Sequence, residues 1–245
     1  MQNGVAGCGP SRVGLRQIGR TCQVKGIFGR IIGAACAIGI AGPALAHPHV
    51  FVDTGLEVIF DDQGRATALR ISWTYDEYYS LVIVEERGID TDYDGTATED
   101  EAKALAGFDM QWDASFDGDT YALVAGADVP LSRPSDWTAS YAGGKITSTH
   151  LRIFTAPVDV VAVELVLQAY DPSYYSVYAI IGTPLLTGAA ASCKVGVFAP
   201  DPDAADAIFQ AAIDEQAGSA DIESTFPAIG AAYSDEARVI CADPS

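Results

Sequence analysis

An acidic stretch covering residues 90–101 has the ligand spacing of a twelve-residue calcium-binding loop. Three aspartates alternate at its first, third and fifth positions, and Gly95 at the sixth position permits a sharp reversal of the chain. Alternating carboxylates can converge on one hard cation, and a glutamate at the twelfth position closes such a site. The predicted ligands are Asp90, Asp92, Asp94, Thr96, Thr98 and Glu101. The alternative is a solvated acidic turn, which is common in acidic proteins.

A second candidate metal site lies at His47-Pro48-His49. Cleavage before His47 would give this segment a free amine beside two imidazoles, a nitrogen-rich set that suits nickel, cobalt, zinc or copper. The amino-terminal copper and nickel motif is excluded, because it needs an amide nitrogen from the second residue and Pro48 has none to deprotonate. His150, in a strand pattern, is a candidate third ligand. The alternative to metal binding is that His47 and His49 only begin a strand and that His150 is a structural residue.

Enzyme chemistry finds little support in the sequence. It contains no G-x-S-x-G elbow, no H-E-x-x-H pair and no phosphate-binding glycine loop. We therefore expect a protein that is not an enzyme, and a copper oxidase with a histidine brace at His47 is the weakest alternative. The formal net charge of −19 repels nucleic acid and attracts cations. Alternatively, the negative net charge is an adaptation to a salty medium.

Residues 1–46 have the features of a cleaved signal peptide. Five basic residues and no acidic residue precede an apolar run from Ile31 to Ile40. Ala44 and Ala46 then bracket Leu45 in the pattern that signal peptidases cut. A membrane anchor is the alternative, but the apolar run is shorter than the roughly 20 residues that a span needs. We expect a periplasmic protein that has no membrane span after cleavage.

The number and positions of the cysteines are consistent with an exported protein. Three of the five lie within residues 1–46, which leaves Cys193 and Cys241 in the mature chain. Two cysteines in an oxidising compartment allow one intramolecular pairing, so we predict a disulfide between them. A catalytic or metal-binding thiol is the minor alternative.

The hydrophobic pattern predicts an α+β fold in one domain, residues 47–245. Alternation over 49–60 and 66–73, separated by the turn at Asp61-Asp62-Gln63-Gly64, predicts an antiparallel hairpin. Further strands are expected at 160–170, 193–198 and 237–241, and a helix at 204–216. Helical patterns on both sides of the acidic stretch predict an EF-hand-like insertion, a helix–calcium loop–helix at about residues 76–107, on an antiparallel sheet.

The segments 47–53, 73–80, 90–101 and 170–175 resemble those of a bacterial periplasmic family, domain of unknown function 1007. That family is described as the periplasmic component of an uncharacterised ABC-type transport system. Its most specific element here is the opening His47-Pro48-His49. The resemblance covers nearly all of the mature chain. It implies an association with nickel/cobalt-type permeases and therefore the handling of divalent transition metals.

Taken together, these features predict a periplasmic metal-binding accessory protein. It would hold a transition metal through His47, His49 and His150 for a membrane permease, and would carry calcium as a structural ion. A different class of function also fits the sequence, namely a calcium-stabilised interaction module without transition-metal binding.

Overall fold

The structure, a computed structural model, describes residues 50–161, 163–216 and 228–242. The predicted signal peptide at residues 1–46 lies outside this range, as do His47 and His49. Among the described residues, no helix is both long enough and apolar enough to cross a membrane.

The described chain is mainly β-structure, with 43% of its residues in strands and 20% in helices. The predicted α+β class is therefore wrong. The strands form two sheets. One contains β5 (Ser135–Ala142), β6 (Lys145–Val158), β2 (Ala66–Tyr75), β1 (Val50–Phe60) and β8 (Ser176–Ile180) in that order, with β9 (Leu185–Thr187) also on β1. The other contains β10 (Cys193–Phe198), β11 (Glu236–Cys241), β7 (Leu165–Ala169), β3 (Thr120–Val124) and β4 (Ala127–Asp128).

Strand β1 organises the first sheet, because both of its edges are paired. It runs antiparallel to β2, which confirms the predicted hairpin, and parallel to β8 and β9 on the other edge. Val52 lies opposite both Tyr75 and Tyr178. Two aromatic residues far apart in sequence are thus brought to the same level of the sheet, near the start of β1.

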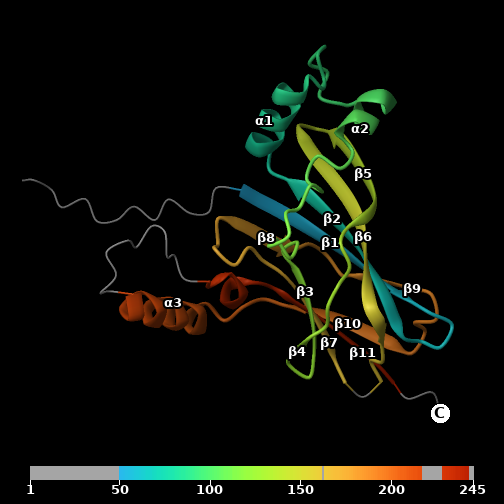
Figure 1. The fold of residues 1–245 in the computed structure, drawn as a ribbon, viewed down its shortest axis with the longest axis vertical. Helices are drawn as coiled ribbons and strands as arrows, with labels where there is room; N and C mark the ends of the chain where they lie inside the picture. The colour runs from blue at the N-terminus through green and yellow to red at the C-terminus, as the bar shows by residue number, and fades with distance from the viewer. Residues whose placement is uncertain (1–49, 162, 217–227, 243–245) are drawn as a thin grey trace, which may run out of the picture. The chain divides into compact units, whose positions relative to one another are not determined.

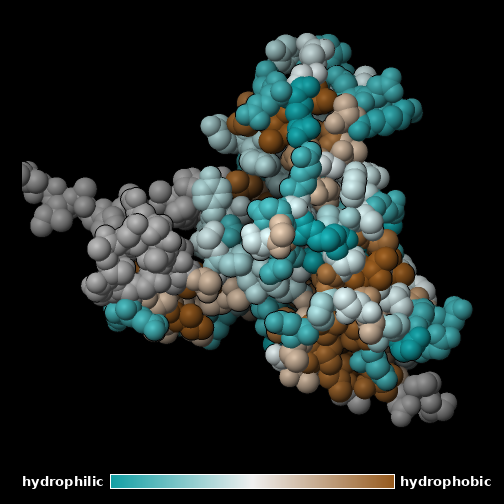
Figure 2. All heavy atoms as spheres, viewed as in Figure 1, coloured by the Kyte–Doolittle hydropathy of each residue, from teal (hydrophilic) through white to brown (hydrophobic). Residues whose placement is uncertain are grey.

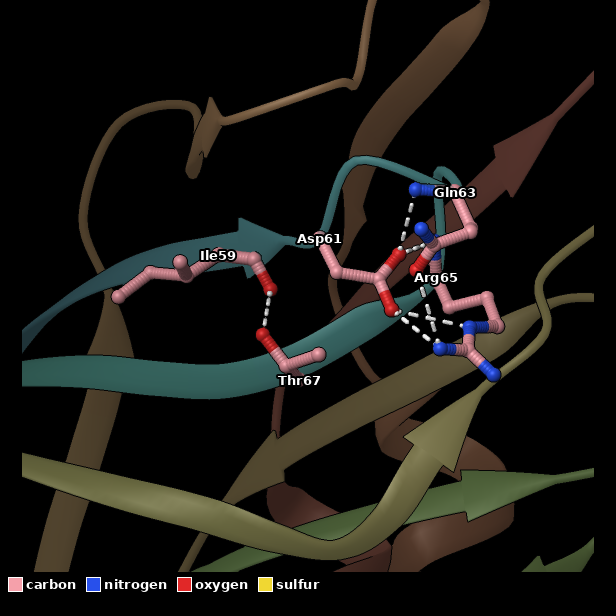
Figure 3. Close-up of polar contacts among 5 residues, drawn as sticks. All are labelled: Ile59, Asp61, Gln63, Arg65 and Thr67. Carbon is pink, nitrogen blue, oxygen red and sulfur yellow. Dashed lines mark hydrogen bonds and ion pairs between the residues drawn. The ribbon is translucent and has the colours of Figure 1, made fainter.

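The turn between β1 and β2 is held by Asp61 (Figure 3). Its carboxylate accepts backbone N–H groups from Gln63 at 3.0 Å and from Arg65 at 2.9 Å, and it also accepts the Arg65 guanidinium at 2.7 Å. These bonds, those from Arg65 first, lower the pKa of Asp61. Thr67 donates its hydroxyl to the Ile59 carbonyl at 3.1 Å. Local side-chain chemistry therefore fixes the register of the hairpin.

The two sheets share one hydrophobic core. Alternate residues of β1, β2 and β6 are buried, as expected for strands with one face on a core. They belong to the same buried cluster as Leu165, Leu167 and Val239 of the second sheet. Trp73 of β2, which is 2% exposed, is among the largest side chains in this core.

Two short helices carry the acidic stretch between them. α1 (Glu77–Arg87) begins after Asp76, whose carboxylate accepts the Tyr79 N–H at 2.9 Å and the Phe51 N–H of β1 at 2.9 Å. α2 (Glu99–Leu105) begins after Thr98 with a complete capping box. A third helix, α3 (Pro202–Gln216), and a 3₁₀ turn at Gly230–Tyr233 lie between β10 and β11 in the chain.

The predicted EF-hand-like insertion is not formed. Each of the two helices packs mainly on the first sheet, α1 against β6 and α2 against β5, rather than on the other helix (Figure 1). Ser80 on α1 accepts the Ile146 N–H of β6 at 2.9 Å and fixes this position. An EF-hand needs two helices that pair around the loop. In this structure each helix packs on the sheet instead of on a second helix. In addition, α2 has only seven residues.

The predicted disulfide is confirmed. Cys193 and Cys241 lie directly opposite each other in the antiparallel pair β10–β11 and are bonded. The bond closes a loop with a sequence separation of 48 residues that includes α3.

We predict that replacing both cysteines by alanine lowers the free energy of unfolding by about 4 kcal/mol, because a cross-link over such a loop restricts the unfolded chain. For a chain of this size, that corresponds to a fall of about 8–16 °C in the melting temperature. Urea and thermal unfolding of wild type and variant would measure it. Equal stability of wild type, reduced wild type and variant would contradict a structural role for the bond.

Candidate functional site

The acidic loop brings three of its six predicted ligands together. One carboxylate oxygen from each of Asp90, Asp92 and Asp94 lies within 4.8 Å of the other two. Asp90 is buried, whereas Asp92 and Asp94 are exposed. Among the residues that the structure describes, this is the one group of three or more acidic, histidine or cysteine side chains with such a geometry.

Hydrogen bonds within the loop preform this group. The Asp90 carboxylate accepts the N–H groups of Asp94 at 2.9 Å and Gly95 at 3.1 Å. Asp94 accepts the hydroxyl of Thr96 at 2.7 Å and its N–H at 2.8 Å, which lowers the pKa of the Asp94 carboxyl. Gly95 has a φ of 80°, a conformation that side chains disfavour. These bonds orient the carboxylates of Asp90 and Asp94.

Glu101, the predicted closing ligand, lies beside the group but is not part of it. Its carboxylate accepts the Thr98 hydroxyl at 2.7 Å and the Thr98 N–H at 2.9 Å, and so caps α2. It also accepts the Asp90 N–H at 3.0 Å, which keeps it next to the first residue of the loop. The bonds from Thr98 lower the pKa of Glu101. The roles of Thr96, Thr98 and Glu101 as ligands stay predictions.

The second half of the loop is joined to the hairpin of β5 and β6. Thr96 forms an antiparallel bridge with Ala142. The Ala97 N–H donates to the Tyr141 carbonyl at 2.9 Å, and the Gly143 N–H donates to the Gly95 carbonyl at 3.0 Å. In paired EF-hands, a second loop makes this type of backbone contact. A single loop is thus braced here by a hairpin.

His150 occupies a buried position far from any such cluster. Its side chain is fully buried, with ring centroids 4.6 Å from Trp73 and 5.6 Å from Trp112. Neither ring nitrogen has a hydrogen-bond partner. Burial, together with the charge of Arg152, lowers the pKa of His150 to about 3, so the imidazole is neutral. In the described chain, His150 belongs to no group of three or more histidine, cysteine or acidic side chains with metal-binding geometry. Its role as a metal ligand stays a prediction.

Sequence reasoning missed two buried carboxyls near these rings. Asp109 accepts hydroxyls from Tyr75, at 2.7 Å, and from Ser148. Asp119 accepts the Tyr178 hydroxyl at 2.8 Å. Burial raises the pKa of both carboxyls, that of Asp119 to about 7. The only signal in the sequence was an aspartate between the apolar residues Phe108 and Met110, which is too common a pattern to single out.

The family model described as "Protein of unknown function (DUF1007)" matches residues 32–241. The chain belongs to this family. A comparison with curated proteins gave no match. Membership in the DUF1007 family covers the acidic loop, His150 and both cysteines, and it assigns no role to any of them.

We predict that His150 makes the fold sensitive to acid. The unfolded chain binds a proton at histidine near pH 6.5, whereas the folded chain does so only near pH 3, so stability falls as the pH drops below 6.5. Replacing His150 by leucine should remove this loss. Between pH 7 and pH 5 the wild type should lose about 2 kcal/mol relative to the variant, as measured by urea unfolding.

Asp119 acts in the opposite direction, since its raised pKa gives stability that is lost as the pH rises from 3.8 to about 7. Both proteins keep Asp119, so its effect cancels in the difference. Thr147→Val on the same strand is the control and should follow the wild type. Parallel pH profiles for wild type and His150→Leu would contradict the prediction.

Proposed function

We propose that this protein is a periplasmic metal-binding accessory protein that handles a divalent transition metal for a membrane transporter and uses calcium as a structural ion. The observation that carries the proposal is the convergence of Asp90, Asp92 and Asp94 within 4.8 Å. A disulfide between Cys193 and Cys241 fits an extracytoplasmic protein. The transporter and the periplasm follow from the family resemblance.

Calcium suits the acidic loop on physical grounds. Carboxylates at this separation repel one another, and a hard divalent cation with oxygen ligands removes that repulsion. Bound calcium would also tie the aspartates at the start of the loop to the half that is bonded to Tyr141 and Gly143. The role assigned to the ion is therefore to hold α1 and α2 against the first sheet.

The transition-metal part of the proposal rests on His47 and His49. Both precede β1, whose second described residue, Phe51, donates its N–H to the carboxylate of Asp76 at 2.9 Å. The Asp76 carboxylate, whose other oxygen caps α1, thus lies next to the point where the segment with both histidines joins the sheet. Nickel, cobalt, zinc and copper all accept imidazole, amine and carboxylate ligands.

We predict that calcium stabilises the wild type by about 1.5–2.7 kcal/mol at ~10 mM, if the affinity is that of an extracellular site at ~10⁻⁴–10⁻³ M. The melting temperature would rise by about 3–10 °C. The double variant Asp92→Asn, Asp94→Asn should show no rise. Differential scanning calorimetry with calcium and with a chelator would measure both.

Asp100→Asn provides the matched control, because Asp100 is exposed, contacts only Lys103 at 3.2 Å and lies outside the cluster. It should keep the full response to calcium. An equal rise in the double variant would show that calcium acts elsewhere and would refute the structural role of this loop.

For the transition-metal part of the proposal, we predict that the processed chain, beginning at His47, binds nickel, cobalt, zinc or copper. The double variant His47→Ala, His49→Ala should not bind them. Isothermal titration calorimetry would measure the binding. The protein must carry no residue before His47, since an added residue blocks the amine. Binding no tighter than high micromolar, or unchanged binding in the double variant, would refute this part.

A calcium-stabilised interaction module is the second candidate. It is favoured by one face of α1, where Tyr78, Leu81 and Val82 are 76%, 50% and 38% exposed. Figure 2 shows hydrophobic atoms, in brown, among the hydrophilic ones over this helix. Such a module responds to calcium but not to transition metals. The two experiments above therefore distinguish it from the first candidate.

A further inference from the structure

A cavity of about 200 Å³ opens beside the start of β1, away from the acidic loop. Its walls come from β1, β2, α1, β8 and the segment before β3. The wall residues are chiefly aromatic: Trp73, Tyr75, Tyr79, Phe116, Tyr175 and Tyr178. A cavity of this size lined by so many rings is larger than side-chain packing requires.

The rings form two contacting pairs. The Trp73 and Tyr178 centroids lie 5.6 Å apart at an interplanar angle of 53°. The centroids of Tyr75 and Tyr79 lie 5.0 Å apart at 34°. Aromatic faces carry partial negative charge, and a cation within about 6 Å of a ring centroid is attracted to them. Several rings around one cavity give such a cation more than one face to contact.

One carboxylate, that of Asp109, also lines the cavity. Its Oδ2 accepts the Tyr75 and Ser148 hydroxyls, but its Oδ1 is buried and has no hydrogen-bond partner. A buried, unpartnered carboxylate oxygen is costly. No lysine or arginine is among the described residues that line the cavity; Arg87 lies over the Phe108 ring and acts on Asp109 only through its charge. The buried Oδ1 is therefore left for a ligand to contact.

We propose that this aromatic pocket binds a quaternary ammonium headgroup, with its positive charge against the partly exposed rings of Tyr79 and Tyr178 and beside Asp109. A primary ammonium needs several hydrogen-bond acceptors, whereas the pocket has one buried acceptor without a partner. A quaternary ammonium needs none. A metal ion does not fit, because the described lining residues offer a single carboxylate, that of Asp109, and no histidine or cysteine.

This inference is independent of the proposed function. It uses no residue of the acidic loop and none of the three histidines. The pocket can therefore bind an organic cation whether or not the protein handles metals, and the two proposals fail separately.

The experiment compares choline with its neutral carbon isostere, 3,3-dimethyl-1-butanol, by isothermal titration calorimetry on the processed protein. The two ligands have nearly the same shape and differ in charge. We expect choline to bind about tenfold more tightly or better, which is the effect of a cation over aromatic rings in a desolvated pocket. Quenching of tryptophan fluorescence by choline, but not by the isostere, is the second readout. Equal affinity for the two ligands, or no binding of choline, overturns the proposal.

Variants locate the site. Asp109→Asn keeps the shape of the side chain and removes its charge, and Tyr79→Leu removes one ring of the wall; each should weaken choline binding about tenfold. Tyr79→Phe keeps the ring and should bind like the wild type. Tyr233→Leu, outside the pocket, is the matched control. Unchanged choline binding in folded Asp109→Asn and Tyr79→Leu overturns the assignment. If these variants do not fold, the comparison of the two ligands in the wild type still tests the proposal.

Discussion

Repulsion among three carboxylates is the constraint on which this end of the molecule depends. Oxygens of Asp90, Asp92 and Asp94 lie within 4.8 Å of one another, and backbone N–H groups of the same loop hold the carboxylates of Asp90 and Asp94. The loop cannot relax by moving away, because its second half is bonded to the β5–β6 hairpin at Tyr141 and Gly143. Like charges fixed at this distance favour a cation. The proposed calcium follows from that constraint.

The same attachment braces a single loop that has no partner loop among the described residues. Thr96 bridges to Ala142 of the hairpin, and α1 and α2 each pack on the first sheet. The twelve-residue pattern specifies the spacing of ligands, but it does not specify what the flanking helices pack against. For that reason the spacing in the sequence led to an EF-hand-like insertion that the structure does not contain.

Local patterns predicted the local features well. Alternating residues and the Asp61–Gly64 turn predicted the β1–β2 hairpin, and two remaining cysteines predicted their bond. Apart from this bond, which joins residues 48 positions apart, contacts between distant segments were beyond the sequence. The parallel pairing of β1 with β8 joins Val52 to Tyr178, and no local pattern indicates it. The aromatic pocket with Asp109 arises from that pairing, and so does the place of Tyr178 beside Trp73. The buried environment of His150 likewise depends on what packs around β6. The alternating pattern of a strand predicts that its residues point to two opposite faces, but it does not predict which face other parts of the chain cover.

The number of calcium ions bound per chain tests the central claim most directly. Calcium titrated into the chelator-treated, processed protein and followed by isothermal titration calorimetry should give one site per chain. Asp92→Asn with Asp94→Asn should remove that site, and Asp100→Asn should retain it. Zero sites in the wild type, or a site that survives the double variant, would contradict the account of this loop.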